Sequence, residues 1–332
     1  MTALGFCPML LERGGVAVGT ILVTGGAGFI GSHVVDTYLE AGFSVAVVDN
    51  LVTGKVENLN PKARFYQVDI MDREALQRVF ERERPFCVNH HAAHINLRQS
   101  VEDPLADARV NILGTLQVLE LSRMYGVQRV IFASTGGALY GEVKELPVGE
   151  EYPPSPLSPY GVAKYAAEKY LSYYEAVWGL SCVALRYGNV YGPRQDPLGE
   201  AGVIAIFSRK ILRNEPCVVF GDGTKTRDYV FVEDVARANL LALHAPSGAY
   251  NIGTGKETSV LELLEFFRRI VGKDIEVVFA EERKGEISRI ALAIERARRL
   301  LGWEPRVALE EGLERTFVWF TEEERVHEGH GA

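Results

Sequence analysis

A tyrosine and a lysine four residues apart, Tyr160 and Lys164, are candidates for acid–base chemistry. Residues i and i+4 of a helix share a face, so the Lys164 ammonium can lie beside the Tyr160 hydroxyl and favour the phenolate. A free phenol has a pKa of about 10 and is a poor base at neutral pH unless a nearby cation lowers that value. Ser134 and Thr135, which end an apolar run 25 residues earlier, add a hydroxyl that can share a substrate oxygen's proton. The pattern favours proton transfer by Tyr160 over a surface pair on an amphipathic helix.

A glycine-rich turn between an apolar run and a helical pattern indicates a dinucleotide site. Gly25, Gly28 and Gly31 have the spacing GxxGxxG. Such glycines allow a tight turn, close approach of backbone to a pyrophosphate and close packing of helix on strand. The helix N-terminus then faces the diphosphate. Asp49 ends the next apolar run, and its carboxylate can accept both ribose hydroxyls while repelling a 2′-phosphate. We therefore predict NAD rather than NADP.

Polar residues also follow the next two predicted strands. Asp69 and Ile70 end the third strand, where a carboxylate can accept the adenine amino group, although an ordinary strand-end aspartate is the alternative. His90, His91 and His94 follow the fourth strand and suggest a metal. No acidic partner or CxxC pair accompanies them, and the small residues between them let a cofactor pass close to the strand. We expect no metal there.

These residues depend for their positions on strands that alternate with helices. The pattern predicts strands at 20–24, 45–49, 64–69, 87–91 and 129–134, and helices at 29–41, 72–82 and 110–125. Asp72 is a plausible cap of the second helix. A segment with five prolines, 145–159, loops over the sheet edge before a helix with Ser158 as N-cap and Pro159 in its first position. The alternation predicts an α/β fold: a Rossmann-type doubly wound parallel sheet with helices on both faces.

The second half is less regular and predicts a smaller C-terminal substrate-binding lobe, which leaves a cleft at the ends of the parallel strands. Its pattern predicts strands at 180–185, 218–220, 229–232 and 250–252, and helices at 203–212, 259–271, 294–301 and 310–320. We divide the chain into an N-terminal extension (1–18), an NAD-binding Rossmann domain (19–185), a mainly substrate-binding lobe (186–322), of which some segments return to the first domain, and a flexible tail (323–332).

Composition and charge exclude several classes of protein. The 332 residues are 47% apolar and 24% charged, which suits a packed core and excludes a disordered or coiled-coil chain. The net charge of −8 disfavours nucleic-acid or anionic-membrane partners. No apolar run approaches the ~20 residues of a membrane helix, and the first residues make a poor signal peptide. Four scattered cysteines without a CxxC pair predict no disulfide framework and a reducing, cytoplasmic location: Cys7, Cys87, Cys182 and Cys217.

Six segments together resemble a known family, the extended short-chain dehydrogenases/reductases. They are TGGAGFIG (24–31), VVDN (47–50), STGGALYGE (134–142), SPYGVAK (158–164), LRYGNVYGPRQ (185–195) and TRDYVFVEDVA (226–236). More narrowly, they resemble the UDP-glucose (UDP-galactose) 4-epimerases, from about Gly19 to Phe320. The resemblance implies an NAD domain and a lobe that binds the nucleotide sugar. It also implies a homodimer formed through helices within 101–125 and 160–177.

The resemblance also implies roles for individual residues. Thr135, Tyr160 and Lys164 fall on the catalytic triad, and Ser134 could share the role of Thr135 because the following turn is one residue longer. The positions expected to contact NAD are Gly25, Gly28, Phe29, Ile30, Gly31, Asp49, Asn50, Asp69, Ile70, Ala92, Ala93, Asn111, Tyr160, Lys164 and Tyr187. The positions expected to contact the nucleotide sugar are Thr135, Tyr160, Asn189, Val203, Phe220, Arg227, Arg283 and Glu286. Ile290 stands where some members have a tyrosine that narrows the sugar pocket, and a smaller residue could admit a 2-acetamido sugar.

The expected activity is therefore NAD-dependent, reversible C4 epimerisation of a UDP-hexose through a 4-keto intermediate, with Tyr160 as base. A 4,6-dehydratase would need an Asp-Glu pair after the threonine, where Gly136 and Gly137 stand. A 4-keto-sugar reductase, or an epimerase of N-acetylated or pentose sugars, stays open. A non-catalytic NAD-binding regulator could dispense with the hydroxyl, phenol and ammonium that this chain retains.

Overall fold

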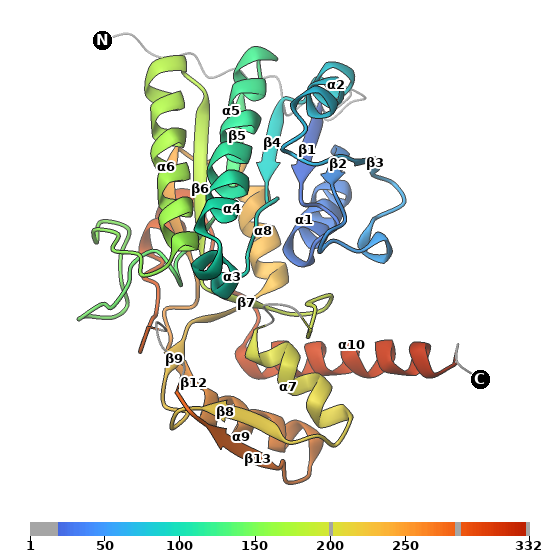
Figure 1. Ribbon diagram of the computed structural model, residues 1–332, viewed down its shortest axis with the longest axis vertical. Coiled ribbons are helices and arrows are strands. Elements are labelled where there is room, and N and C mark those ends of the chain that lie inside the picture. The colour runs from blue at the N-terminus through green and yellow to red at the C-terminus, as the bar shows by residue number, and fades with distance from the viewer. Residues whose placement is uncertain (1–18, 199–201, 283–286, 330–332) are drawn as a thin grey trace.

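A computed structural model describes residues 19–198, 202–282 and 287–329, and shows a parallel sheet between two layers of helices (Figure 1). Within these residues, seven strands form the sheet in the order β11-β6-β5-β4-β1-β2-β3, and every neighbouring pair is parallel. The predicted fold class is confirmed. The strands are β1 (Thr20–Thr24), β2 (Ser44–Asp49), β3 (Arg64–Gln67), β4 (Cys87–His90), β5 (Arg129–Thr135), β6 (Ser181–Tyr187) and β11 (Gly248–Ile252).

Both faces of the sheet are apolar, which explains why helices cover both of them. Ile21 and Val23 of β1 pack on one face with α1 (Phe29–Glu40) and α8 (Val232–Ala242). Leu22, between them in sequence, packs on the other face. Successive strand residues point to opposite faces, and burying each large apolar side chain contributes roughly 1.5–3 kcal/mol. The helices on that second face are α2 (Arg73–Glu83), α5 (Thr115–Met124) and α6 (Pro159–Trp178).

The predicted starts of two helices are confirmed by hydrogen bonds. Asp72 accepts a hydrogen bond from the Ala75 backbone N–H at 3.0 Å and caps α2. Ser158 does the same for α6, accepting from the Gly161 N–H at 3.2 Å. A side-chain cap of this kind contributes about 1 kcal/mol because it satisfies a helix N–H that has no partner within the helix. The cap fixes where α6 begins, and so where Tyr160 stands.

A smaller lobe with its own core lies below the sheet in Figure 1. Its aromatic centre includes Phe207, Phe231 and Phe267. Short strands pair within it or beside it: β10 (Tyr229–Phe231) with β7 (Asn189–Tyr191), β12 (Thr258–Ser259) with β9 (Thr226–Arg227), and β13 (Val277–Ala280) with β8 (Cys217–Phe220). Its helices are α7 (Val203–Leu212), α9 (Val260–Val271) and α10 (Leu309–Gly329).

Two elements from the second half of the chain complete the sheet and its helical layer. β11 pairs with β6 at the sheet edge, and α8 lies against α1. Arg129, at the start of β5, donates to the carbonyls of Ala242 and Ala245 at 2.7 and 2.6 Å, which ties the end of α8 to the sheet. Both elements lie in the range 186–322, so that range contributes to the large domain as well as to the lobe. No helix among the described residues is long and apolar enough to cross a membrane.

Several element boundaries differ from those predicted. β3 ends at Gln67, not Asp69, because Asp69 begins a turn in which its carboxylate accepts the Met71 N–H at 2.8 Å. The predicted helix at 110–125 is a π-helical segment (Arg109–Gly114) followed by α5, and the one at 294–301 is largely π-helical (Ala297–Leu301). α10 continues past Phe320 to Gly329 through much of the expected tail, and Glu324 pairs with Arg213 of α7 at 2.9 Å.

Some helices are absent from the sequence prediction altogether. The pattern at 229–232 predicts a strand, but α8 begins at Val232 and runs to Ala242. Two short helices, α3 (Leu97–Glu102) and α4 (Pro104–Ala108), precede the π-helical segment, and a single 3₁₀ turn spans Val56–Asn58. The α4 helix proves important for the site described next.

Candidate active site

The glycine turn after β1 brings three chain segments unusually close together. Gly25 has a φ of +71°, and a Cβ there would lie 2.6 Å from the backbone nitrogen of Ala92. A Cβ on Gly31 would overlap the carbonyl oxygen of Gly25. Gly28 is the N-cap of α1 and offers no side chain to its first N–H groups. These donors, with the positive end of the helix dipole, can therefore bind an anion. Phe29 and Ile30 follow, half-buried, in the first turn of α1.

The carboxylates expected to bind the adenosine half lie beside this turn. Asp49, at the end of β2, accepts the Ala27 N–H at 3.0 Å and the Leu51 N–H at 2.9 Å, so it is fixed against the glycine loop. Asn50 donates to Asp69 at 2.9 Å, which joins the ends of two segments. Ile70 is buried, in contrast to its exposed neighbour Asp69.

His90, the last residue of β4, is held by two hydroxyl groups. His90 Nδ1 lies 2.6 Å from the Thr24 hydroxyl and its Nε2 lies 3.1 Å from the Thr115 hydroxyl. Burial lowers its pKa to about 3, so the ring stays neutral. Among the described residues, no group of three or more His, Cys, Asp or Glu side chains could hold a metal ion. Ala92 and Ala93 lie between His91 and His94 without large side chains, and Asn111 donates to the His94 carbonyl at 2.8 Å.

Helix α6 brings Tyr160 and Lys164 to the end of β5. The buried Lys164 ammonium donates to the Ala133 carbonyl at 2.9 Å and lies 5.8 Å from the Tyr160 ring centroid. Thr135, the last residue of β5, accepts the Ala138 N–H through its hydroxyl at 3.1 Å. Gly161 allows α6 to start this close to the loop after β5, since a Cβ there would lie 2.5 Å from the Ala138 carbonyl.

The pKa values of Tyr160 and Lys164 differ from the expectation that Lys164 favours the phenolate form of Tyr160. Burial raises the pKa of the Tyr160 phenol above its usual value, and the carboxylate of Asp107 raises it further. Burial also lowers the pKa of Lys164 to about 8, and Asp107 opposes that change. Desolvation disfavours whichever form is charged, and it is the largest cause of both shifts. Without a ligand, Tyr160 is therefore a phenol.

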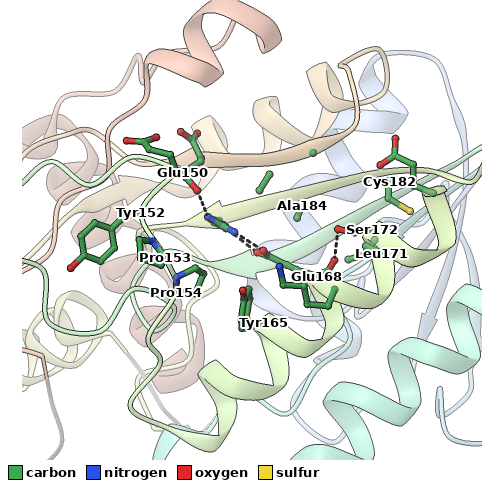
Figure 2. Close-up of a pocket in the computed structure, with 16 residues that line it drawn as sticks. Glu150, Tyr152, Pro153, Pro154, Tyr165, Glu168, Leu171, Ser172, Cys182 and Ala184 are labelled. Atoms are coloured by element: carbon green, nitrogen blue, oxygen red, sulfur yellow. Dashed lines mark hydrogen bonds and ion pairs between the residues drawn. The ribbon is translucent and has the colours of Figure 1, made fainter. Parts of the chain in front are cut away.

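Ser134 is directed to a different cluster from Thr135. Its hydroxyl donates to Glu168 Oε1 at 2.6 Å, and Glu168 is bound on both oxygens by Arg186, at 3.0 and 2.7 Å. Glu168 borders a cavity of about 230 Å³ between α6 and the loop around Glu150 and Tyr152 (Figure 2). Because consecutive strand residues face opposite ways, Ser134 does not join Thr135 beside Tyr160.

The residues expected to bind the nucleotide sugar are spread over the lobe boundary. Tyr187, expected to contact NAD and not the sugar, ends β6; it accepts a hydrogen bond from Asn239 at 2.9 Å, and its ring stacks on that of His91 with the centroids 6.1 Å apart. Asn189 lies in β7, with its N–H donating to the Asp228 carbonyl. Phe220, partly exposed at the end of β8, lines a cavity of about 400 Å³. Val203 starts α7, and Arg227 lies in β9 outside the cavity lining. Arg283 and Glu286 lie outside the described residues.

Two cations that line this cavity were not among the sequence candidates. Lys225 pairs with Glu282 at 2.9 Å, and Arg289 is bound to Glu257 through two nitrogens. In the sequence, these two cations are marked only by the cluster of basic residues around Arg227 and Arg283. Such a cluster does not show which basic side chains contact a ligand and which form ion pairs. Ile290, the position linked to sugar size, is 1% exposed and packs with Tyr140, Val148 and Leu292.

Comparison with known proteins gives matches over nearly the whole chain. The model of the NAD dependent epimerase/dehydratase family matches residues 21–253. A UDP-glucose 4-epimerase of Thermotoga maritima, solved with UDP-glucose, is 52% identical with a TM-score of 0.90, over 92% of this chain and 99% of that one. A UDP-glucose 4-epimerase of Thermus thermophilus, solved with NAD, is 48% identical with a TM-score of 0.88, over 91% and 99%. A putative UDP-glucose 4-epimerase of Methanocaldococcus jannaschii is 48% identical over 92% of this chain and all of its own length.

Proposed function

Because this chain belongs to the NAD dependent epimerase/dehydratase family, we propose that it interconverts UDP-hexoses that differ at C4, with NAD as its cofactor. The observation that carries the proposal is that the Lys164 ammonium donates to the Ala133 carbonyl near the end of β5 and lies 5.8 Å from the Tyr160 ring, while Thr135 is the last residue of the same strand. The same chain is about half identical to solved UDP-glucose 4-epimerases that hold UDP-glucose or NAD.

The residues around the glycine turn fit NAD. The space that a Cβ on Gly25 or Gly31 would fill is already occupied by backbone, so segments meet there as closely as the pyrophosphate site of such a fold requires. The uncapped N–H groups of α1 can bind the diphosphate, and the fixed carboxylate of Asp49 can accept the ribose hydroxyls. When bound, NAD supplies the acceptor and later the donor of a hydride at C4.

The triad supplies the accompanying proton transfer. Tyr160, once ionised, accepts the proton of the 4-hydroxyl and returns it after the planar 4-keto sugar has turned over in the pocket. Lys164 supports this step as long as it stays an ammonium, because a positive charge nearby lowers the free energy of the phenolate. Thr135 shares the substrate oxygen's proton through its hydroxyl. Arg227 can hold the diphosphate with forked donors during the rotation.

The loop after Thr135 argues against a dehydratase. Gly136 stands where dehydration chemistry needs an acidic side chain, and a Cβ there would lie 2.5 Å from Leu292. No larger residue fits without displacing Leu292. Ile290, the position linked to sugar size, is packed in an apolar cluster, and incubation with both sugars decides between a plain and an N-acetylated hexose.

We also propose that two copies pair through α6 and its neighbours. Val162, Tyr170, Tyr173 and Val177 lie on one stripe of α6 and are 39–55% exposed, so packing on their own sheet does not account for them. A contiguous apolar surface of this kind is typical of a protein–protein interface. Tyr170→Glu is expected to give a monomer by light scattering; an unchanged mass would contradict this interface.

A cytoplasmic location fits Cys87, Cys182 and Cys217, which are unpaired in the structure.

The decisive experiment is incubation with UDP-glucose and UDP-N-acetylglucosamine in parallel, with the products identified. We expect inversion at C4 of at least one sugar and NAD(H) in the purified protein. Hydride that returns to the carbon it left carries no solvent label, so C4 of the recovered isomer should contain no deuterium after reaction in heavy water. Protein free of NAD(H), or deuterium at C4, would contradict the proposal.

A further inference from the structure

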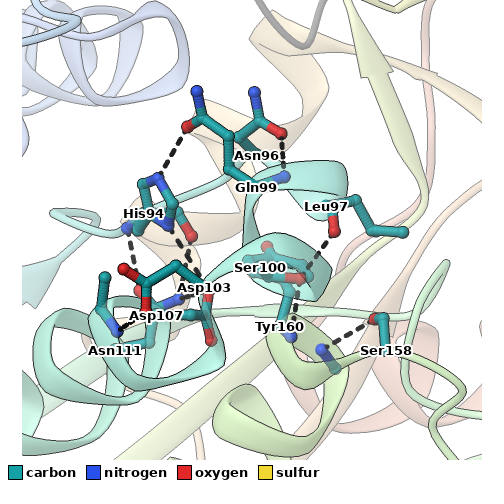
Figure 3. A network of polar contacts seen from close by, with 12 residues as sticks. His94, Asn96, Leu97, Gln99, Ser100, Asp103, Asp107, Asn111, Ser158 and Tyr160 are labelled. Atoms are coloured by element: carbon teal, nitrogen blue, oxygen red, sulfur yellow. Dashed lines mark hydrogen bonds and ion pairs between the residues drawn. The ribbon is translucent and has the colours of Figure 1, made fainter.

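A buried carboxylate that the triad does not include stands beside Tyr160. Asp107 of α4 is 0% exposed, and α4 packs directly on α6. Its Oδ1 accepts a hydrogen bond from Asn111 at 2.9 Å and lies 3.6 Å from His94 Nδ1 (Figure 3). Its Oδ2 is buried without a hydrogen-bond partner, and so is His94 Nδ1. A buried polar atom without a hydrogen-bond partner lowers the stability of the fold by about 1–3 kcal/mol or more. A protein tolerates this loss where the group has another role.

The neighbours of Asp107 show which purpose this is. The charged and titratable groups that face it are His94, on the segment after β4, and Tyr160 and Lys164, on α6. Arg98 and Glu102 of α3, and Arg109 of the π-helical segment, are exposed to solvent. The carboxylates of Asp107 and Glu168 both raise the pKa of the buried Lys164, and Glu168 is already bound by Arg186. Burial raises the pKa of Asp107 itself, and His94 and Lys164 oppose that rise. Asp107 is the carboxylate whose charge is left for Lys164.

We propose that Asp107 is a positioning residue for the proposed epimerisation: its carboxylate is the counter-ion that keeps Lys164 an ammonium next to Tyr160. A lysine without such a partner loses its proton when it is buried, and with it the charge that supports the phenolate. His94, on the other side of Asp107, and Asn111, which is bonded to the same Oδ1, hold the carboxylate in place. This inference rests on the function proposed above, because it assigns a role within that reaction.

Removing this charge has a distinctive consequence. Asp107 raises the pKa values of both Tyr160 and Lys164, so its loss lowers both. The active form needs an ionised Tyr160 and a protonated Lys164. In the holoenzyme, where the positive charge of oxidised NAD would bring the pKa of Tyr160 below that of Lys164, the acid limb of the pH–rate profile reports Tyr160 and the alkaline limb reports Lys164. Both limbs should therefore move toward acid. A purely structural defect would instead lower the rate at every pH.

The test is the pH–rate profile of sugar interconversion by the holoenzyme, for wild type and Asp107→Asn. Asparagine has the same shape and can still accept the hydrogen bond from Asn111. We expect both limbs to move toward acid by about one to two pH units, as for a charge roughly 6 to 12 Å away in an effective dielectric of about 20. Asp103→Asn, the same change at the exposed N-cap of α4, is the matched control and should leave the profile in place. Asp107→Glu should restore the wild-type limbs.

A second measurement separates this inference from the proposed function. Tyrosine labelled with carbon-13 at the ring carbon that bears the hydroxyl reports ionisation of Tyr160, which the spectrum of Tyr160→Phe assigns. The Tyr160 signal should titrate at lower pH in Asp107→Asn than in wild type. If Asp107→Asn does not fold, Asp107→Ser removes the same charge. Superimposed profiles and titrations overturn the inference, whereas a wild type that converts no sugar overturns the proposed function and leaves the titration to decide on Asp107.

Discussion

Two buried carboxylates, Glu168 of α6 and Asp107 of the α4 helix packed on it, have opposite surroundings. Glu168 has both oxygens occupied, by Ser134 and by two nitrogens of Arg186. Arg186 in turn donates to the Tyr140 hydroxyl at 2.8 Å, and Tyr140 donates to Asn251 at 2.7 Å. Asp107 of α4 has one oxygen bonded and the other without a hydrogen-bond partner.

The difference distinguishes buried polar groups that stabilise the fold from buried polar groups that take part in the reaction. A buried network in which every group is bonded joins β5, β6, β11 and α6 in one arrangement, and it loses stability when one member is removed. A group left partly unpaired keeps its charge available for a neighbour or a ligand. We therefore expect changes around Glu168 to affect folding, and changes around Tyr160 to affect the rate.

The largest expected effect is on the rate. Tyr160→Phe removes the proton acceptor and should reduce turnover by roughly a thousandfold or more, as for the loss of a general base. The apolar ring keeps its packing, so the unfolding midpoint and the content of bound NAD should stay close to wild type. Product formation and cofactor absorbance are the measurements. An active variant would mean that another group is the base.

The next effect is on stability. Arg186→Met leaves Glu168 buried without its cation and should lower the free energy of unfolding by about 3 kcal/mol or more. Denaturant titration measures the loss. The double variant Glu168→Met with Arg186→Met removes both charges and should recover most of it. Equal losses in the single and double variants would show that the pair itself contributes little.

A pH dependence follows from Lys164. Burial lowers its pKa to about 8, so the ammonium is present below pH 8 and is lost above it. In the holoenzyme, where the positive charge of oxidised NAD would lower the pKa of Tyr160 and keep it a phenolate, turnover should therefore fall above pH 8 and approach a tenfold loss per pH unit. The unfolded chain binds this proton up to higher pH than the folded chain does, so this group makes folding more favourable as pH rises above 8. Rates measured across pH 8 with saturating sugar check the first statement. A turnover rate that stays unchanged up to pH 10 would contradict it.

The smallest effect provides a scale for the others. Asp72→Ala removes one exposed cap of α2 and should cost about 1 kcal/mol, with no change in turnover. Asp72→Asn retains the cap and should cost less. If Asp72→Ala lowered the free energy of unfolding as much as Arg186→Met does, a single surface hydrogen bond and a buried network would contribute equally, contrary to the comparison above.

Most of the sheet and half of the site could be predicted because local patterns encode them. Apolar runs that end in glycine or aspartate locate β1 and β2, and the i, i+4 spacing places Tyr160 and Lys164 on one face. The α8 helix was missed although Val232, Val235 and Ala236 are spaced as on a helix, because the preceding Tyr229–Phe231 reads as a strand that continues. Its position depends on Asp234, which accepts the N–H groups of Arg306 and Val307 far along the chain.

The remaining site residues could not be predicted because they act through contacts distant in sequence. Asp107 lies in a five-residue helix whose composition suggests a surface turn, and only the packing of α4 on α6 buries it. Ser134 and Thr135 have similar hydroxyls, and only the direction of each side chain along β5 separates them. The raised pKa of Tyr160 likewise depends on burial, which residue spacing does not report.

The closure of the sheet by β11 has a consequence for how the chain is made. Until residues 248–252 leave the ribosome, β6 is an open edge whose backbone can pair with strands of other nascent chains. The sheet of the larger domain therefore cannot be completed before the part of the smaller lobe that precedes β11 has also been translated. For the same reason, no single recombination point exchanges the lobes as intact modules, because a crossover after β6 would separate the sheet from its last strand and from α8.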